Sequence, residues 1–301
     1  MSAPTSSATR DISLIKEIFV ASIALAAYLV SSDERVVRNV QRLYPETVTK
    51  ATDFPVDFEV EVKGGLGLHR FIHRQARFLC EGHEPFQPLP AQHSYAMLEW
   101  GLNYVVAANE FTYAIVHAGI LALNDNAIMF PAPPGSGKST LTLWLAFHGW
   151  RLLSDEMALV KPNSLDVVPF VRPICLKNKS IELAKAWFPH AVMSDITRNT
   201  HKGDVCHVSP PQHSWQNNRR EARLSAIVFP KYQAGSALEI YQLNQAQAFA
   251  ELANNAFNMS VLGKLGFDTA FKLVSSLPAF TVQYSNMDEL TQFLLELVAD
   301  D

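Results

Sequence analysis

The stretch Ala127-Ile-Met-Phe-Pro-Ala-Pro-Pro-Gly-Ser-Gly-Lys-Ser-Thr140 is the most informative segment of the sequence. It opens with a short apolar run and continues into a loop of small residues. After the loop, Leu141, Trp144, Leu145 and His148 follow the i, i+3, i+4, i+7 spacing of one helix face. The next residue, Gly149, is predicted to end this helix. The pattern predicts a strand, a tight loop and a helix in direct succession.

The loop has the composition of a phosphate-binding loop. Small residues let several backbone N–H groups converge on one anion, and the positive end of the following helix dipole faces the same point. Lys138 adds a point charge for the outer phosphates, and the hydroxyl of Ser139 is a ligand for Mg²⁺. Ala132 stands where the usual pattern has its first glycine. The predicted nucleotide-binding residues are Pro134, Gly135, Ser136, Gly137, Lys138, Ser139 and Thr140.

An acidic pair follows the loop at short range. Asp155 and Glu156 follow Lys138 by 17 and 18 positions and lie within an apolar stretch. Adjacent acids are costly to bury unless they meet a cation or a proton donor. One acid can hold Mg²⁺ and the other can accept the proton of an attacking hydroxyl, as phosphoryl transfer requires. The alternative is an ordinary polar turn between two strands.

Further polar residues are weaker candidates. His117 precedes Lys138 by 21 positions, and a lone histidine beside an apolar strand is more often a core residue than a catalytic one. Arg172, Lys177 and Lys202 could stabilise charge on a transferred phosphoryl group, or could be ordinary surface cations. One cluster of possible zinc ligands comprises Cys175, His201, Cys206 and His207, but its spacing fits no usual zinc-binding pattern.

Composition limits the class of protein. The chain has 301 residues, 48% of them hydrophobic and 18% charged, as expected for a globular protein. A net charge of -4 and scattered basic residues predict no nucleic-acid partner. Three widely spaced cysteines favour a reducing compartment. The apolar run Ile18–Val30 has 13 residues, fewer than the roughly 20 that a span needs, so we expect a buried element, no membrane and a cytoplasmic protein.

The order of strands and helices predicts an α/β (mixed α+β) fold. Prolines at 85, 88 and 90 mark a rigid loop, and we predict an N-terminal accessory region over residues 1–98 and a P-loop nucleotide domain over 99–301. A final helix should begin at an Asn286–Glu289 capping pair. Strands are expected at 58–62, 113–116, 120–123, 127–130, 159–160, 224–229, 238–243 and 280–284.

Taken together, these segments resemble one family. A His-x-Gly at 117–119, the loop about twenty residues later and the acidic pair 17 after the lysine are similar to the catalytic domain of HPr kinase/phosphorylase, and closer still to the HPr-kinase-related kinase A group. Segments that also match that group are Glu99-Trp-Gly-Leu-Asn103, Phe130-Pro-Ala-Pro-Pro-Gly-Ser-Gly-Lys-Ser-Thr140, Gly149-Trp-Arg-Leu-Leu-Ser-Asp-Glu156, Arg172-Pro173, Leu176-Lys-Asn178, Lys202-Gly203 and Asn255-Ala-Phe-Asn258.

The resemblance implies a nucleotide domain of the HPr kinase/phosphoenolpyruvate carboxykinase type that phosphorylates a hydroxyl, using ATP (or another nucleoside triphosphate) and Mg²⁺. By position, Asp155 would be the general base, and Glu156, where the parent family has Asp, would hold Mg²⁺ with Ser139. Cationic His117 would lower the pKa of Asp155 and titrate between about pH 6 and 8. Catalytic roles are thus predicted for Asp155, Glu156, His117 and Lys138.

Two other classes stay open: a nucleotide hydrolase or motor, and a nucleotide-binding regulator without phosphoacceptor. The acids follow the lysine more closely than in the usual ATPase layout, and the intact Lys138, Ser139, Asp155 and Glu156 argue against an inactive kinase. The acceptor is a serine of a protein or peptide, or a small-molecule hydroxyl. The sequence is compatible with a homo-oligomer and fixes neither the assembly, nor the nucleotide preference, nor whether reverse phosphorolysis occurs.

Overall fold

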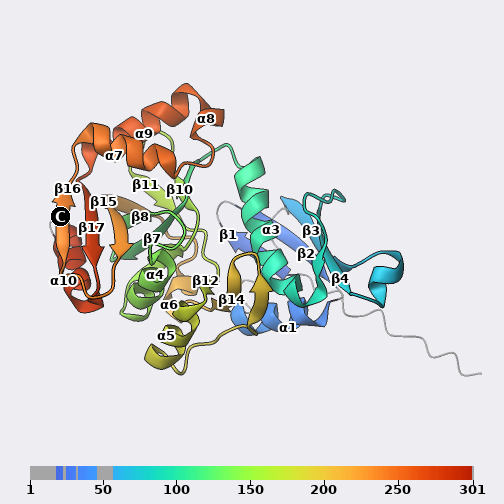
Figure 1. Ribbon diagram of the computed structural model, residues 1–301. Coiled ribbons are helices and arrows are strands. Elements are labelled where there is room, and N and C mark those ends of the chain that lie inside the picture. The colour runs from blue at the N-terminus through green and yellow to red at the C-terminus, as the bar shows by residue number, and fades with distance from the viewer. Residues whose placement is uncertain (1–17, 23–24, 32, 46–56, 300–301) are drawn as a thin grey trace, which may run out of the picture.

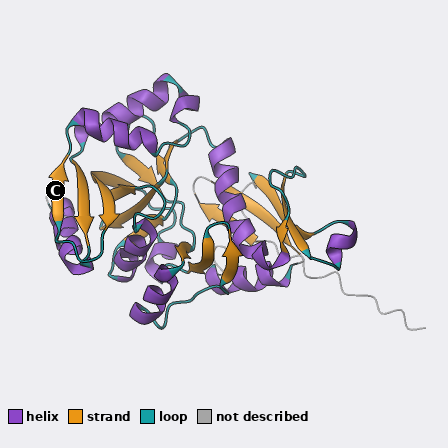
Figure 2. Cartoon of the chain, viewed as in Figure 1, coloured by secondary structure: helices purple, strands orange, loops and turns teal. Residues whose placement is uncertain are grey.

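The structure, a computed structural model, describes residues 18–22, 25–31, 33–45 and 57–299. Strands and helices are mixed along the chain, so the expected α/β class is confirmed (Figures 1 and 2). The strands within these ranges form three sheets, of five, nine and three strands.

The five-stranded sheet is built from the N-terminal part of the chain. Its order is β1-β2-β3-β4-β5, and only β2 and β3 run parallel. The apolar run that began at Ile18 forms its first two strands. The elements of this part are β1 (Ile18–Ser22), β2 (Leu25–Ser31), α1 (Glu34–Leu43), β3 (Phe58–Gly64), η1 (Gly67–Arg70), β4 (Gln75–Cys80), β5 (Leu89–Pro90) and η2 (Ala91–His93).

Helix α3 (Ser94–Asn109) lies against this sheet. Gly101 permits the close approach, since a Cβ there would stand 2.2 Å from the ring of Phe78 on β4. The other side of α3 reaches the second part of the chain, because its buried residues share a core with Ile115 and Leu159. The division predicted between residues 98 and 99 falls inside this helix and stays a prediction.

The nine-stranded sheet carries the predicted loop. Its order is β6-β10-β11-β15-β8-β7-β9, and β17 pairs with β15 and β16. β8 lies between antiparallel β7 and parallel β15, so its C-terminal end opens at the middle of the sheet. The strands are β6 (Ala114–Val116), β7 (Ala118–Leu123), β8 (Asn126–Pro131), β9 (Arg151–Ser154), β10 (Ala158–Val160), β11 (Asp166–Val168), β15 (Ala222–Tyr232), β16 (Glu239–Gln242) and β17 (Ala279–Tyr284).

Two separate cores cover the faces of this sheet. Residues of α7 and α9 pack on one face, and residues of α4, α5 and α10 pack on the other, together with the three-stranded sheet β12-β14-β13 (Figure 1). These elements are α4 (Lys138–Phe147), β12 (Ile174–Lys177), α5 (Lys179–Trp187), β13 (Thr197–Thr200), β14 (Gly203–Val208), α6 (Gln212–Gln216), α7 (Gln245–Asn254), α8 (Met259–Leu262), α9 (Lys264–Ser276) and α10 (Met287–Val298).

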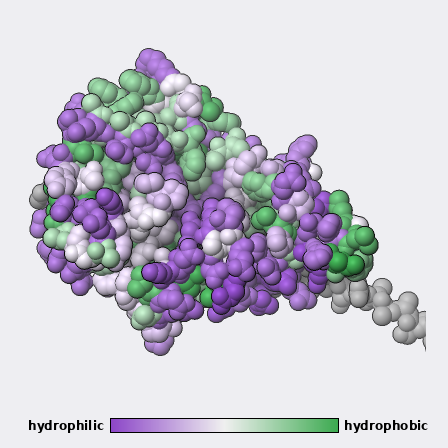
Figure 3. Space-filling view, viewed as in Figure 1, coloured by the Kyte–Doolittle hydropathy of each residue, from purple (hydrophilic) through white to green (hydrophobic). Residues whose placement is uncertain are grey.

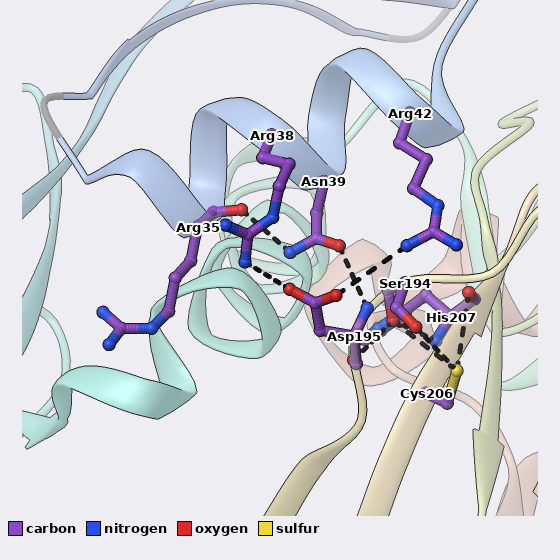
Figure 4. A network of polar contacts seen from close by, with 8 residues as sticks. All are labelled: Arg35, Arg38, Asn39, Arg42, Ser194, Asp195, Cys206 and His207. Carbon is purple, nitrogen blue, oxygen red and sulfur yellow. Dashed lines mark hydrogen bonds and ion pairs between the residues drawn. The ribbon is translucent and has the colours of Figure 1, made fainter.

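Polar contacts also join α1 to the segment before β13 (Figure 4). The Asp195 carboxylate forms ion pairs with Arg38 and, at 3.7 Å, with Arg42. The backbone N–H of Asp195 donates to Asn39 Oδ1 at 3.1 Å. The N-terminal helix is therefore bound to the hairpin that carries Lys202.

Most elements predicted from the sequence are present. Asn286 caps α10 as expected, accepting from the N–H groups of Asp288 and Glu289. The helix after the loop, α4, ends at Phe147, just before the predicted stop at Gly149, which has a φ of +93°. His148 is exposed and its ring stacks on Trp144, with ring centres 3.9 Å apart. Among the described helices, none combines the length and apolar character needed to cross a bilayer.

Candidate active site

The glycine loop (residues 132–137) joins β8 directly to α4. Gly135 and Gly137 have φ of +90° and +91°, a region that favours glycine. A Cβ on Gly137 would also stand 2.8 Å from Cβ of Tyr232, at the end of β15. The N–H of Tyr232 donates to the carbonyl of Ser136 at 2.9 Å. The loop is thus held by the neighbouring strand, in the strand–loop–helix setting that the sequence predicted.

The start of α4 brings the predicted lysine and serine to Asp155. Nζ of Lys138 donates to the carbonyl oxygen of Asp155 and lies 3.9 Å from its Oδ1. The hydroxyl of Ser139 donates to Asp155 Oδ2 at 3.2 Å, and the N–H of Cys175 donates to the same oxygen at 3.1 Å. The adjacent residues Lys138 and Ser139 therefore meet Asp155, which follows them by 17 and 16 positions.

Asp155 is buried at this point. Burial raises the pKa of its carboxyl, and the charge of Lys138 opposes that shift without cancelling it. Its Oδ1 accepts no hydrogen bond from the described residues. A buried carboxyl with a raised pKa and a free oxygen is suited to accepting a proton.

Glu156 belongs to a different set of contacts. Its Oε2 accepts a hydrogen bond from the side-chain amide of Asn103 on α3. The amide oxygen of Asn103 accepts in turn from Arg172, whose second terminal nitrogen forms an ion pair with Glu99. Glu99 and Asn103 are four residues apart on α3, so one turn of this helix holds both ends of the chain of contacts.

Two tyrosines complete the burial of Glu99. The hydroxyls of Tyr44 and Tyr95 donate to its Oε1 at 2.9 and 2.6 Å. Burial alone would raise the pKa of Glu99, but the charge of Arg172, the charge of His207 and the hydrogen bonds from Arg172 and Tyr95 together lower that pKa. The Glu99–Arg172 pair is thus ionised and hydrogen-bonded, as a buried ion pair must be to persist.

Four cations surround Glu156. Burial tends to raise its pKa, but their combined charge lowers it to about 2; in order of effect they are Lys138, Lys177, Lys202 and Arg172. Nζ of Lys202 also lies over the ring of Trp100 on α3, 5.1 Å from its centre. The structure therefore gathers the three downstream basic residues that the sequence singled out, although their contacts differ.

Arg172 has contacts that the other two basic candidates lack. It is buried, and its two terminal nitrogens bind Asn103 and Glu99. Through Asn103 its side chain helps to position Glu156. The phosphate or substrate roles of Arg172, Lys177 and Lys202 stay predictions.

The expectation that His117 titrates between about pH 6 and 8 is wrong. Burial, followed by the charge of Lys138, lowers the pKa of His117 to about 4, so the imidazole is neutral between pH 6 and 8. The carboxylate that raises this pKa is that of Glu156, not the Asp155 that was expected. The ring packs beside Phe257, with centres 5.5 Å apart, at the edge of the site.

The predicted metal pair was Ser139 with Glu156. The carboxylate hydrogen-bonded to Ser139 is that of Asp155, and the structure adds this residue to the candidate ligands. A hydroxyl and carboxylate oxygens are ligands that Mg²⁺ prefers, and Oδ1 of Asp155 is a buried acceptor without a donor among the described residues. The residues present thus fit Mg²⁺. The described residues hold no cluster of three His, Cys, Asp or Glu side chains suited to a metal, and the zinc alternative gains no support.

A small cavity lies between α3 and the acidic pair. It is lined by Glu99, Trp100, Asn103, Ser154, Asp155, Glu156, Phe170, Arg172, Pro173, Cys175 and His207. Sequence reasoning gave Asn103 and Trp100 no role, although both lie in a segment that carried the family resemblance. The signal that could have found Asn103 is its i+4 spacing from Glu99 in an otherwise apolar helix.

Comparison with known proteins gives little. No protein-family model matches the chain, and no curated protein matches it. Among solved structures, one similar chain is the HPr(Ser) kinase/phosphatase from Coxiella burnetii, with 11% identity and a TM-score of 0.29 over 62% of this chain and 94% of that one. At this similarity neither a family nor a function follows.

Proposed function

We propose that this chain is an ATP-dependent, Mg²⁺-requiring kinase that transfers the γ-phosphate to a hydroxyl, a serine of a protein or peptide. The observation that carries the proposal is the meeting of Lys138, Ser139 and Asp155 at the end of the glycine loop. A lysine for the outer phosphates, a hydroxyl for the metal and a carboxyl within 3.9 Å of the lysine are the groups that phosphoryl transfer needs at one point.

The loop is suited to phosphate. Its backbone N–H groups lie at the N-terminal end of α4, a helix of 10 residues, and favour an anion there. The hydroxyl of Ser136 is buried and has no hydrogen-bond partner among the described residues. A phosphate oxygen would give this group a partner, whereas a purely structural glycine turn would leave it unsatisfied.

Asp155 is the proposed proton acceptor. The ammonium of Lys138 marks where the outer phosphates would lie, and an attacking hydroxyl must approach the same place. Its raised pKa makes Asp155 a better base than Glu156, whose pKa is about 2. Mg²⁺, when bound, would neutralise charge on the phosphates, held by Ser139 and the ionised carboxylate of Glu156. Lys177 and Lys202 would add positive charge on the acceptor side.

The test is to follow the labelled γ-phosphate of ATP with purified protein and Mg²⁺. We expect label on serine of an acceptor that phosphoproteomics identifies by comparing cells with and without the enzyme, and none with Lys138→Ala. Free phosphate as the sole product would indicate a hydrolase. ATP that binds but stays unchanged with every acceptor would indicate a regulator, and either result would refute the kinase.

A further inference from the structure

The β3–β4 connection exposes large apolar side chains at one end of the molecule. Leu66, Leu68, Phe71 and Ile72 are 59%, 75%, 80% and 60% exposed. Figure 1 shows the connection projecting beyond β3 and β4, and Figure 3 shows hydrophobic surface gathered at that end. We call residues 66–74 the apolar tip. Four such side chains within seven residues form a patch of the kind that marks an interaction surface.

Backbone hydrogen bonds give the tip a defined shape. The N–H of His69 donates to the carbonyl of Leu66 at 3.1 Å, and those of Phe71 and Ile72 both donate to Leu68 at 2.9 Å. Gly67, at a φ of +54°, makes the turn. The base is closed by a bond from Gly65 to Gln75, so the apolar side chains are displayed by a folded turn and not by an open loop.

The tip is also positively charged. No Asp or Glu occurs from Lys63 to Arg77 in a chain whose net charge is -4. The two outer cations are paired, Lys63 with Glu61 and Arg77 with Glu84. The two that lie within the tip, Arg70 and Arg74, are exposed and form no ion pair with the described part of the chain.

We propose that the apolar tip binds the surface of an anionic lipid bilayer from one side, in place of the absence of a membrane partner that the sequence led us to expect. Leu68 and Phe71, the most exposed of the four, would enter the interface, while Arg70 and Arg74 would contact the anionic headgroups. A projecting turn presents its apolar groups outward and fits a bilayer better than a groove. The charge complementarity selects an anionic surface. This proposal concerns a surface remote in sequence from the kinase residues and does not depend on them.

A second exposed apolar pair, on α9, serves as a comparison for the apolar tip. Phe267 and Phe271 on α9 are about half exposed and stack on each other. In their helix, Lys264 is ion-paired with Asp268 and Lys272 is the remaining cation, whereas the tip carries Arg70 and Arg74 and no acid. This pair is therefore a control for apolar exposure with less positive charge.

The experiment is co-sedimentation of the full chain with vesicles. One set contains phosphatidylcholine alone, and the other contains equal parts of phosphatidylcholine and phosphatidylglycerol. We expect binding to the anionic vesicles that weakens as salt rises, and much weaker binding to the neutral ones. Leu68→Ser with Phe71→Ser should weaken anionic-vesicle binding roughly a hundredfold. Arg70→Gln with Arg74→Gln should weaken it roughly thirtyfold.

Phe267→Ser with Phe271→Ser should bind vesicles as the unaltered chain does, and thermal melting of all three variants checks that each is folded. Absence of vesicle binding, equal binding to both compositions, or binding that the tip variants leave unchanged would each overturn the proposal. A tip variant that changes the molar mass of the unbound protein in light scattering, while vesicle binding is absent, would assign the tip to a protein contact instead.

Discussion

The two halves of the candidate site differ in how far apart their residues lie in the chain. In the glycine-loop half, defined by Lys138, Ser139 and Asp155, contacts join residues 16 to 17 positions apart. In the α3 half, contacts join residues 53 to 73 positions apart; this half comprises Glu99, Asn103, Glu156 and Arg172. One half is formed by β8, the glycine loop and α4 together with the end of the next strand, β9. The other forms only when the N-terminal part packs on the nine-stranded sheet.

This difference gives two adjacent carboxyls opposite properties. Asp155 is buried against the backbone of Cys175 and one lysine, and burial raises its pKa. Glu156, the next residue, is surrounded by four cations that lower its pKa to about 2. The halves therefore supply different chemistry, a proton acceptor on one side and a fixed negative charge on the other.

The largest effect should come from Lys138→Ala, which removes the glycine-loop half's only predicted contact with the outer phosphates. We expect kcat/KM for ATP-dependent transfer to fall by at least about a thousandfold, because a point charge at the reacting phosphate is lost. ATP affinity from calorimetry and turnover from labelled ATP measure it. Lys185→Ala is the control, since Lys185 is half exposed and, within the described residues, forms an ion pair with Glu182 alone, at 3.4 Å. A folded Lys138→Ala protein with normal affinity and turnover would remove the basis of the proposed function.

The next comparison separates the two carboxyls. Asp155→Asn should lower kcat by roughly a hundredfold or more and leave ATP affinity nearly unchanged, because a proton acceptor acts in the chemical step. Glu156→Gln should mainly raise the Mg²⁺ concentration needed for half-maximal rate. Steady-state rates over a Mg²⁺ series measure both.

The contact between Ser139 and Asp155 makes the opposite outcome informative. If Asp155→Asn raises the Mg²⁺ requirement more than Glu156→Gln does, Asp155 is the metal ligand and the two roles exchange. If the two variants respond identically, the halves do not divide the chemistry.

The α3 half can be broken at Arg172. Arg172→Met should lower the free energy of unfolding by about 3–5 kcal/mol, because Glu99 would keep a buried charge without a partner. Urea denaturation measures this loss. Glu99→Gln combined with Arg172→Met should lose less than the single change, since neither charge is then left alone.

A control for this prediction lies on α9. Lys264→Met breaks an exposed ion pair with Asp268 and should cost less than about 1 kcal/mol. Equal losses at Arg172 and Lys264 would mean that the buried pair does not hold the α3 half together.

The same contrast explains what could be predicted from the sequence. The strand, the loop and α4 follow from apolar periodicity and small residues within one short stretch, and so do Lys138, Ser139 and the neighbouring acids. The contacts of Arg172 could not be predicted, because its partners are on α3 and no spacing rule connects residues 69 to 73 positions apart. The apolar tip was not predicted either, because only packing tells an exposed Leu68 from a buried one.

The smallest effect concerns His117, which lies near Glu156 at the boundary of the two halves. Its pKa of about 4 means that the imidazole is neutral from pH 6 to 8. We therefore expect His117→Ala to leave the shape of the pH–rate profile unchanged over this range.

The folded-state pKa of His117 is below the ordinary value of 6.5, so the unfolded chain binds the proton more readily. Stability attributable to neutral His117 should thus be present above about pH 6.5 and lost as pH falls toward 4. Urea denaturation over that range should show a smaller acid loss for His117→Ala than for the unaltered chain. A flattened pH–rate profile in the variant would instead show that the imidazole titrates near neutrality and acts on the site through its charge.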